Sequence, residues 1–416
     1  MKIALISDLH LGFGKGERIK DSFTQALQAL ELALQSKAEL IILSGDLFDD
    51  SVPSTETWHD AFSLFEELKP ERQNGVKALI EVFGQQGIKA DEFSLNQVPI
   101  IAIHGTHEFR GKDFRNALEV LKASNNIIYI HAMKAIVSIN SEKIAVSGLG
   151  GVPEKKALEV LQLWNPKPEK GLQNLLVLHQ SLKEFLPFDD EMVASLSLED
   201  LPKGFQFIVN GHLHWHKEMQ LGKEQLLVLP GSTVITQMKK IEAGQRKGFY
   251  LLDSSSGRLG FIELPLQRKL FYHKVSFKDA KPEEVLAESR AFIESCLQEN
   301  RQELKPLIRL KLSGSLSKGF HSSDLVNLSG LIDEFRDKAV ISVDKDFTSI
   351  DFKEKIIELR KLQEKKLSVL EMGLELLEKN FKALNPGSGI DSSQLFELLA
   401  GDKIDEAIEL LGKAKN

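Results

Sequence analysis

Short apolar runs alternate with amphipathic segments over the first 265 residues. In the amphipathic segments apolar residues recur every three or four positions, which is the period of one helix face. Buried strands joined by crossover helices predict an α/β fold, and the closely spaced strands that follow predict two packed sheets. The predicted strands are 2–7, 40–44, 99–103, 127–130, 135–139, 143–147, 175–178, 205–209 and 226–229, and the predicted helices are 23–34, 55–68 and 114–123.

One stretch within this half of the chain is less regular. Residues 69–97 are rich in Gln and Gly, and their apolar positions follow neither a helix period nor a clear alternation. We expect an insertion or a pair of helices there, placed between the second and third strands of the predicted sheet.

The pattern changes after Pro265. Residues 268–350 predict strand, helix, strand, helix and strand, which indicates a small α+β domain. Beyond residue 351 the chain is predicted to be helical, with apolar residues in a heptad-like seam. We call Leu367, Leu370, Leu374, Leu377, Phe381 and Leu384 the C-terminal seam. The predicted elements of the second domain are 273–277, 282–298, 307–312, 323–335 and 340–343, and the predicted domains are 1–266, 267–350 and 351–416.

Composition and charge narrow the class of protein. The chain has 416 residues, and 42% of them are hydrophobic, which suffices for two or three domains. A net charge of −7 does not indicate a nucleic-acid binder, although a local basic surface remains compatible with it. The single cysteine, Cys296, excludes an internal disulfide framework. Without a secretory signal or an apolar run near the ~18 residues that a membrane span needs, we expect a cytoplasmic protein.

Candidate chemistry collects just after the predicted strands. The chain has 11 histidines, and several stand, together with aspartates, where an apolar run ends. In open α/β sheets, ligands bind beyond the carboxyl ends of the strands. We therefore expect these side chains to meet in one pocket. They are Asp8, His10, Asp46, His107, His179, His212 and His214.

The spacing of these residues favours a metal centre. Each motif alone could be explained by a turn, a helix cap or a hydrogen-bonded core histidine. Several such motifs in order, each directly after an apolar strand, are unlikely to occur by chance. If D-x-H and H-x-H lie in extended segments, both side chains of each pair point to the same side. Imidazoles and carboxylates suit Mn²⁺, Fe or Zn²⁺ better than Ca²⁺. The ligands outnumber those of one ion, so two ions roughly 3.5–4 Å apart are expected.

These motifs, taken in order, resemble the signature of the calcineurin-like metallophosphoesterases. Weaker stretches (GDLFDDSVPS, LVLHQS, GLGGVP, LPGSTVITQ, KGFYLLD and QRKLFYHKVSF) make the chain similar to the DNA double-strand-break repair branch, the archaeal Mre/Rad-type, SbcD-like nuclease subunits. The resemblance implies a four-layer sandwich of two packed sheets flanked by helices, a small capping domain, and a C-terminal helical partner-binding segment. The motifs are Asp8-x-His10, Gly45-Asp46-x-x-Asp49, Gly105-x-His107-Glu108, His179 and Gly211-His212-x-His214.

The resemblance also implies a role for each site residue. Two Mn²⁺ ions, or other divalent cations, are expected, with His107 as the group that acts on the leaving oxygen. Thr106 stands where the family carries Asn, so either its hydroxyl binds the second cation, or a water fills the gap, or that site is weaker. Glu108 is expected to orient His107, to cap the following turn or to make a salt bridge. The implied ligands are Asp8, His10, Asp46 and His214 for the first cation, and Asp46, Thr106, His179 and His212 for the second.

The function implied by the resemblance is a di-metal DNA exonuclease and endonuclease that processes DNA ends. Implied partners are DNA, a second copy of the chain, and a Rad-type ABC/SMC-like ATPase at the C-terminal seam, which could instead fold back on its own protein. Two alternatives stay open: a small-substrate metallophosphodiesterase, and a catalytically weak scaffold that binds DNA and the ATPase. The basic residues considered for phosphate contacts are Arg268, Lys269, Lys274, Arg309 and Lys311.

Overall fold

The computed structural model divides into two compact units. The first contains Met1–Tyr272, Cys296–Arg309 and Lys338–Val340, and the second contains the described parts of His273–Ser295, Leu310–Asp337 and Ile341–Asn416. Short segments thus cross the boundary expected near residue 266, and the three-part division remains a prediction. The structure describes residues 1–68, 77–84, 87–111, 113–186, 196–349, 371, 373–378, 392–401 and 403–413.

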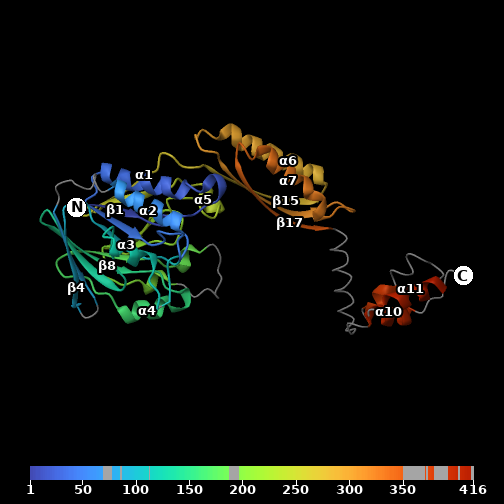
Figure 1. Cartoon of the computed structure of the whole chain (residues 1–416), viewed down its shortest axis with the longest axis horizontal. Helices are drawn as coiled ribbons and strands as arrows, with labels where there is room; N and C mark the ends of the chain where they lie inside the picture. The colour runs from blue at the N-terminus through green and yellow to red at the C-terminus, as the bar shows by residue number, and fades with distance from the viewer. Residues whose placement is uncertain are drawn as a thin grey trace. The chain divides into compact units, whose positions relative to one another are not determined.

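The first unit contains a six-stranded mixed sheet (Figure 1). Four neighbouring strands from the first part of the chain are parallel. Of the two later strands, one pairs antiparallel with the first strand of the chain, and the other pairs antiparallel with that added strand at the sheet edge. Across the sheet the order is β14 (Arg258–Glu263), β13 (Gly248–Asp253), β1 (Lys2–Ile6), β2 (Leu40–Ser44), β5 (Ile100–Ile103) and β6 (Ile128–Tyr129).

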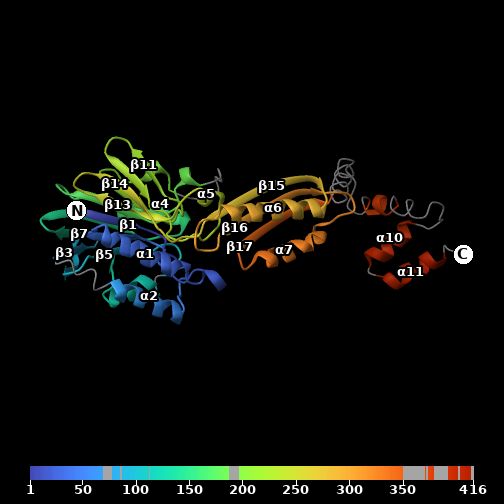
Figure 2. The same cartoon turned by 90° about the horizontal axis from the view of Figure 1, so that it is seen from above.

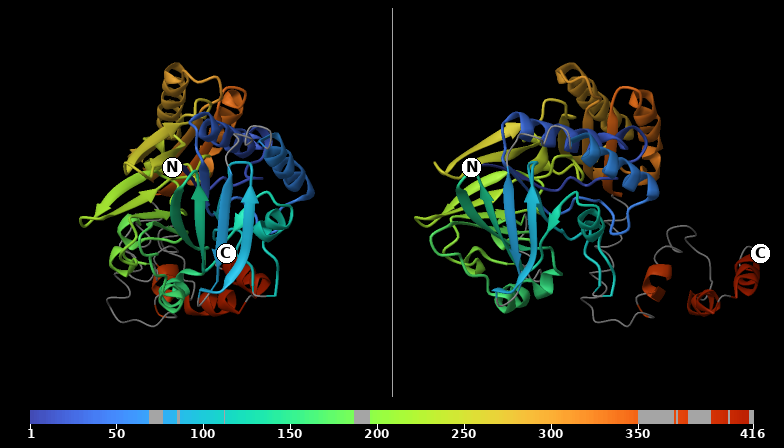
Figure 3. Two further views of the ribbon diagram at one scale, coloured as in Figure 1. Left: turned by 90° about the vertical axis from the view of Figure 1, so that its left-hand side faces the viewer. Right: turned by 60° about the vertical axis from the view of Figure 1, so that its left-hand side comes forward.

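A second, eight-stranded sheet lies against the first (Figure 3). Four neighbouring strands, β12, β10, β9 and β8, are parallel, and the others are antiparallel. The order is β11 (Lys217–Leu221), β12 (Gln225–Leu229), β10 (Phe207–Asn210), β9 (Gln173–Leu178), β8 (Glu142–Leu149), β7 (Met133–Ile139), β3 (Ala78–Phe83) and β4 (Lys89–Leu95).

Alternate residues of the strands build a layered core. Ile3 and Leu5 of β1 pack between the two sheets, whereas Ala4 and Ile6 pack toward the helices on the other face, because successive side chains of a strand point to opposite faces. The helices on that face include α1 (Asp21–Gln35) and α2 (Thr55–Leu68), which lie side by side (Figure 2). With α3 (Ala117–Ala123) on that side and α4 (Ala157–Trp164) on the outer face of the second sheet, the predicted four-layer sandwich is confirmed.

Two local predictions need correction. The expected insertion or helix pair at 69–97 is wrong for its described part, which is the antiparallel hairpin β3–β4. Ala78, Ile80 and Val82 are buried alternately with more exposed neighbours, a period of two that the flanking Gln and Gly obscured. The helix expected over 114–123 begins only at Ala117, because Asn116 forms a capping box with Glu119.

The C-terminal elements begin with a three-stranded sheet, ordered β15-β16-β17, with the predicted alternation of strands and helices. The C-terminal seam is described only at Leu374 and Leu377, within a helical stretch at 373–378; its other members lie outside the described residues. The elements are β15 (Leu270–Ala280), α6 (Pro282–Glu299), β16 (Leu307–Leu316), a 3-10 helix (Ser322–Val326), α7 (Asn327–Phe335), β17 (Val340–Ser349), α10 (Ser392–Ala400) and α11 (Ile404–Lys413).

Candidate metal centre

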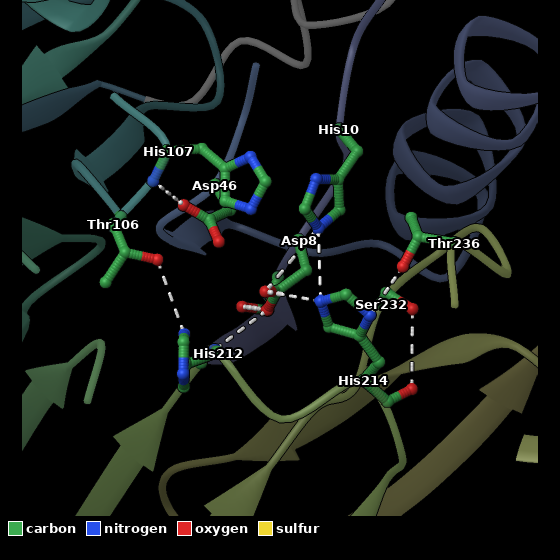
Figure 4. A network of polar contacts seen from close by, with 12 residues as sticks. Asp8, His10, Asp46, Thr106, His107, His212, His214, Ser232 and Thr236 are labelled. Atoms are coloured by element: carbon green, nitrogen blue, oxygen red, sulfur yellow. Dashed lines mark hydrogen bonds and ion pairs between the residues drawn. The ribbon is translucent and has the colours of Figure 1, made fainter. Parts of the chain in front are cut away.

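The predicted ligands come together at the carboxyl ends of five strands. β1, β2 and β5 of the six-stranded sheet end just before Asp8, Asp46 and Thr106, and β9 and β10 of the eight-stranded sheet end just before His179 and the H-x-H pair. Figure 4 shows side chains from both sheets facing one another across this edge. The structure therefore brings these side chains together at one edge. Asp8, His10 and His214 form one potential metal-binding group, and Asp46, His179 and His212 form another. His10 also belongs to a third, more exposed group with Asp49 and His107.

The backbone of the site is not extended, which corrects the reasoning from residue spacing. Asp8, His10, Asp46 and His212 have φ values of 52°, 48°, 49° and 75°. Residues with a side chain seldom adopt this left-handed region, and such conformations concentrate at functional sites. The paired residues therefore reach a common pocket through tight, unfavourable turns held by the surrounding fold, and not through the alternation of a strand.

Gly45 lets the second strand's loop pass close to a ligand. Its φ is +97°, and a Cβ there would lie 2.2 Å from Nδ1 of His179. That imidazole instead donates from Nδ1 to the carbonyl oxygen of Ser44 at 2.7 Å. The missing side chain at position 45 therefore allows the backbone of one sheet to orient a histidine of the other.

The first group holds two imidazoles with their Nε2 atoms facing each other. Nε2 of His10 and Nε2 of His214 are 3.2 Å apart, and Oδ1 of Asp8 lies 3.9 and 3.7 Å from them. Nδ1 of His10 donates to Asp49 at 3.0 Å, and Nδ1 of His214 lies 2.7 Å from the hydroxyl of Thr236. These outer partners turn the bare Nε2 lone pairs inward, where a cation would satisfy both.

The second group is built around a carboxylate and a buried imidazole. Nε2 of His179 lies 3.0 Å from Oδ2 of Asp46, yet no described residue offers it an aligned hydrogen bond. Oγ1 of Thr106 lies 3.4 Å from Nδ1 of His212, so the threonine faces this group (Figure 4). Oδ1 of Asp46 accepts the backbone N–H of His107 at 2.8 Å, which fixes the carboxylate between the loops.

Electrostatics favour neutral imidazoles and positive charge at this edge. Burial lowers the pKa of His212 to about 4 and that of His214 well below its usual value, so both keep free lone pairs at neutral pH. Burial opposes a charge on His179, but the adjacent Asp46 raises its pKa to about 10. The pKa of Asp46 is lowered, against burial, chiefly by His179. Without a metal, a proton on His179 supplies the positive charge that Asp46 requires.

The residues present fit a pair of divalent cations. Oδ1 of Asp8 is buried and has no hydrogen-bond partner among the described residues, which is costly unless an ion binds it. Each of His10 and His179 donates its other ring nitrogen to an oxygen, the arrangement typical of metal-bound histidine. The His/Asp residues therefore form a dimetal site.

His107 stands at the rim of the site and not inside it. Its side chain is 41% exposed, its ring lies 4.9 Å from that of His10, and its Nδ1 donates to the backbone carbonyl of Asp49. Glu108 is fully buried and does not orient this ring in the structure. It accepts backbone N–H groups of Phe48 and Gly105 at 2.8 and 2.6 Å, so it ties together the loops after β2 and β5. Burial and Asp46 raise its pKa to about 8.

Two other histidines of the first unit, His104 and His216, have structural roles. His104 donates from Nε2 to the carbonyl of Gly151 and accepts from the hydroxyl of Tyr129, and burial lowers its pKa to about 3. The ring of His216 stacks on Phe261 at 3.8 Å. Both side chains hold neighbouring segments together, and neither belongs to a potential metal-binding group of the described residues.

The basic residue Arg268 is unavailable for phosphate contacts. Its guanidinium is 7% exposed and donates to Asp21 at 2.8 Å, and also to the carbonyls of Lys305 and Glu17 at 3.0 Å. The positive charge of Arg268, one of those considered for phosphate contacts, is therefore paired with Asp21 inside the first unit.

Several residues that support the ligands were not singled out from the sequence. Ser7 donates to Asp8, Thr236 contacts His214, and Lys247 donates to the carbonyl of His214. Thr236 and Lys247 lie in the stretches LPGSTVITQ and KGFYLLD. Those stretches marked the resemblance, but their contacts with the H-x-H pair arise only in the fold.

The family described as calcineurin-like phosphoesterase matches residues 1–216. This match takes in more than half of the chain and every ligand described above, so the chain belongs to the calcineurin-like phosphoesterases, a family of metal-dependent enzymes. Among the part of the chain that the structure describes, no helix is long and apolar enough to cross a membrane. The cytoplasmic location remains a prediction.

Within this family the chain is Mre11-like. It is 26% identical over 380 residues to the double-strand break repair protein MRE11 of Mus musculus, covering 79% of this chain and 52% of that protein. It is 24% identical over 325 residues to the DNA double-strand break repair protein Mre11 of Sulfolobus acidocaldarius, covering 76% of each. The chain thus spans about half the length of the mouse relative. A dimetal phosphatase structure from Danio rerio aligns over 60% of this chain and 91% of that one, with 9% identity and a TM-score of 0.33, too low to add to the argument.

Proposed function

We propose that the chain is a di-metal DNA nuclease, with exonuclease and endonuclease activity, that processes DNA ends in double-strand-break repair. The observation that carries the proposal is the convergence of two His/Asp groups with His107 at their rim. The similarity to Mre11 proteins extends beyond the catalytic fold, over 79% of the chain for the mouse protein. A small-substrate phosphodiesterase would not require the elements after β14.

The reaction we propose is hydrolysis of a phosphodiester. When bound, two divalent cations supply a nucleophile at neutral pH and neutralise charge on the phosphate. Asp8, His10 and His214 would hold one cation, and His179, His212 and Thr106 the other, with Asp46 between them. The donor set of imidazoles, carboxylates and a hydroxyl suits Mn²⁺, and we propose Mn²⁺ as the metal in the cell.

His107 is proposed to act on the leaving oxygen. Because Nδ1 donates to the carbonyl of Asp49, Nε2 is the ring nitrogen left to face a substrate. A proton on Nε2 makes the ring cationic, and the carboxylate of Asp49, 3.8 Å from Nδ1, stabilises that charge. The ring can then donate this proton as the P–O bond breaks.

We propose that a Rad-type ABC/SMC-like ATPase binds at the C-terminal seam and that the chain forms a homodimer through 55–68 and 112–123. Exposed apolar side chains at Phe62, Phe114 and Val120 support the dimer surface, with exposed fractions of 36%, 62% and 41%. Deleting 351–416 is expected to release the ATPase and spare cleavage of simple substrates. Continued co-purification of the ATPase with the shortened chain would contradict this docking site.

One assay separates the nuclease from the two alternatives. Purified chain is incubated with Mn²⁺ and linear duplex DNA, single-stranded DNA or a chromogenic phosphodiester. DNA cleavage that disappears in Asp8→Ala and His107→Ala supports the nuclease. Turnover of the small ester alone favours a small-substrate phosphodiesterase, and DNA binding without cleavage, even with the ATPase added, favours a scaffold.

A further inference from the structure

Lys247, the residue before β13, is a buried cation that the proposed chemistry does not use. Its side chain is 3% exposed. Nζ donates to the backbone carbonyl of His214 at 2.6 Å, to Oγ of Ser232 at 2.9 Å and to Oε1 of Glu242 at 2.8 Å. An ammonium group has three N–H donors, so every donor of this buried charge has a partner, and one partner is the peptide of a metal ligand.

The same part of the chain also holds the ring of His214. The hydroxyl of Thr236 lies 2.7 Å from Nδ1, and the N–H of Ser232 donates to the carbonyl of His214 at 3.3 Å. Gly231, with φ of +76°, passes so close that a Cβ would lie 2.8 Å from the backbone nitrogen of His216. The loop after β12 therefore fixes both the peptide and the imidazole of His214.

Glu242 makes this arrangement nearly neutral. It belongs to the short helix α5 (Lys240–Ala243), is 1% exposed, and pairs with Lys247. A buried charge without a partner is costly, and a buried pair adds little to stability in itself. Because the pair has no net charge, it adds little repulsion toward cations at the site. Its effect is to hold the peptide of His214 in place, because charged Lys247 donates a strong hydrogen bond to that carbonyl.

We propose that the Lys247–Glu242 pair is a positioning device for His214 and thereby sets the affinity of the first cation position, that of Asp8, His10 and His214. The proposal rests on the dimetal site of the proposed function and adds a specific determinant to it. The second position, that of Asp46, His179 and His212, is not in contact with Lys247 and keeps its affinity when the pair is broken.

The test is the affinity of Lys247→Met for Mn²⁺, measured by calorimetry in the full chain. Methionine keeps the length of the side chain and removes the charge. In a His179→Ala background, which isolates the first position, we expect affinity to fall by ~10- to 100-fold. In a His10→Ala background, which isolates the second, we expect no change. Electron paramagnetic resonance of bound Mn²⁺ is expected to lose one imidazole nitrogen coupling at the first position.

Lys89→Met is the matched control. Lys89 also bonds two carboxylates, Glu81 and Glu92, but lies on β4, far along the eight-stranded sheet from the ligands, and this variant is expected to bind Mn²⁺ normally. An unchanged first position in Lys247→Met, or equal weakening of both positions, overturns the proposal. A wild-type chain that binds no Mn²⁺ would instead refute the dimetal function itself.

Two further variants keep the test decisive if Lys247→Met does not fold. Thr236→Val preserves shape and removes the contact to the ring of His214, and Glu242→Gln removes the counter-charge while keeping an acceptor oxygen. Each is expected to weaken the first position by several-fold. Thr236→Val should leave the melting temperature of the metal-free protein unchanged, whereas Glu242→Gln should lower it, because the buried charge of Lys247 loses its counter-charge. Unchanged Mn²⁺ affinity in both folded variants overturns the proposal.

Discussion

The two halves of the metal centre differ in how deeply their ligands are buried and how firmly their rings are held. In the first, the side chains of Asp8 and His10 are 0% and 1% exposed, and His214 is 10% exposed, with each ring held from behind. In the second, His179 is fully buried, but His212 is 29% exposed. Thr106 at 3.4 Å, Glu154 at 3.9 Å and the ring of His179, centred 5.3 Å away, lie next to its ring. The ligands of the first position are therefore already held in place in the metal-free protein, whereas His212 of the second position is held less firmly until a cation binds. We therefore expect the first position to bind Mn²⁺ more tightly.

The largest effect is expected where the two halves meet. Asp46→Ala removes the carboxylate placed between them and should abolish binding at both positions, with a loss of activity of ~10³-fold or more, equivalent to about 4 kcal/mol. Calorimetry with Mn²⁺ measures the binding. The exposed neighbour Asp50 supplies the control, since Asp50→Ala should leave both positions intact. Two intact positions in Asp46→Ala would show that the halves are independent.

His107→Ala is expected to separate chemistry from binding. The ring lies beside the first half but binds no cation in our proposal, so DNA cleavage should fall by ~10²- to 10⁴-fold while both Mn²⁺ affinities stay unchanged. Single-turnover cleavage and calorimetry on the same preparation provide the two readouts. Loss of a cation together with activity would reassign this histidine as a ligand of the first half.

The two positions should also differ in their pH dependence. The pKa of His179 is raised to about 10 by Asp46, so at neutral pH this ring is protonated in the metal-free protein and must lose its proton to bind a cation. Affinity at the second position should therefore rise about tenfold per pH unit between pH 6 and 8, with one proton released. His214 is already neutral because burial lowers its pKa, so the first position should change less. Calorimetry in buffers of different ionisation enthalpy counts the protons, and equal release at both positions would contradict the assignment.

The smallest effect is expected at Thr106. Thr106→Asn lengthens the side chain by one atom and should tighten the second position by a few-fold, up to ~10-fold, without altering the first. Thr106→Val, which removes the oxygen at constant shape, serves as the opposite control and should weaken it. If neither variant changes the second affinity, the threonine oxygen takes no part in binding.

The local pattern was enough to predict much of the fold. The helix predicted over 55–68 is α2 itself, Thr55–Leu68, and the buried strands β1, β2 and β5 end where their apolar runs end. The hairpin β3–β4 was missed because the apolar Leu79 stands at an exposed position of β3 and β4 is at most half-buried, so apolar and polar residues do not alternate clearly along the sequence. Edge strands carry a weaker hydrophobic pattern than central ones, since one face and one side meet water.

The candidate site likewise has features that the sequence predicted and features that it did not. Placement after strand ends predicted which residues meet, because parallel strands deliver their carboxyl ends to one edge. It left open whether Glu108 orients His107 or caps a turn, and it could not predict that Glu108 would also bond the distant N–H of Phe48, or that Arg268 would be buried against Asp21. Those outcomes depend on contacts between segments distant in the sequence, which periodicity and spacing do not encode.

By itself, the sequence determined the order of strands and ligands and hence the chemistry of the site, because residue type and strand end are local properties. The tertiary structure alone decided how the ligands are aimed. The left-handed turns at Asp8 and His10, and the bonds from Lys247 to the peptide of His214 and from Thr236 to its ring, are held by packing between the two sheets. A strained backbone of this kind persists only when surrounding contacts stabilise it.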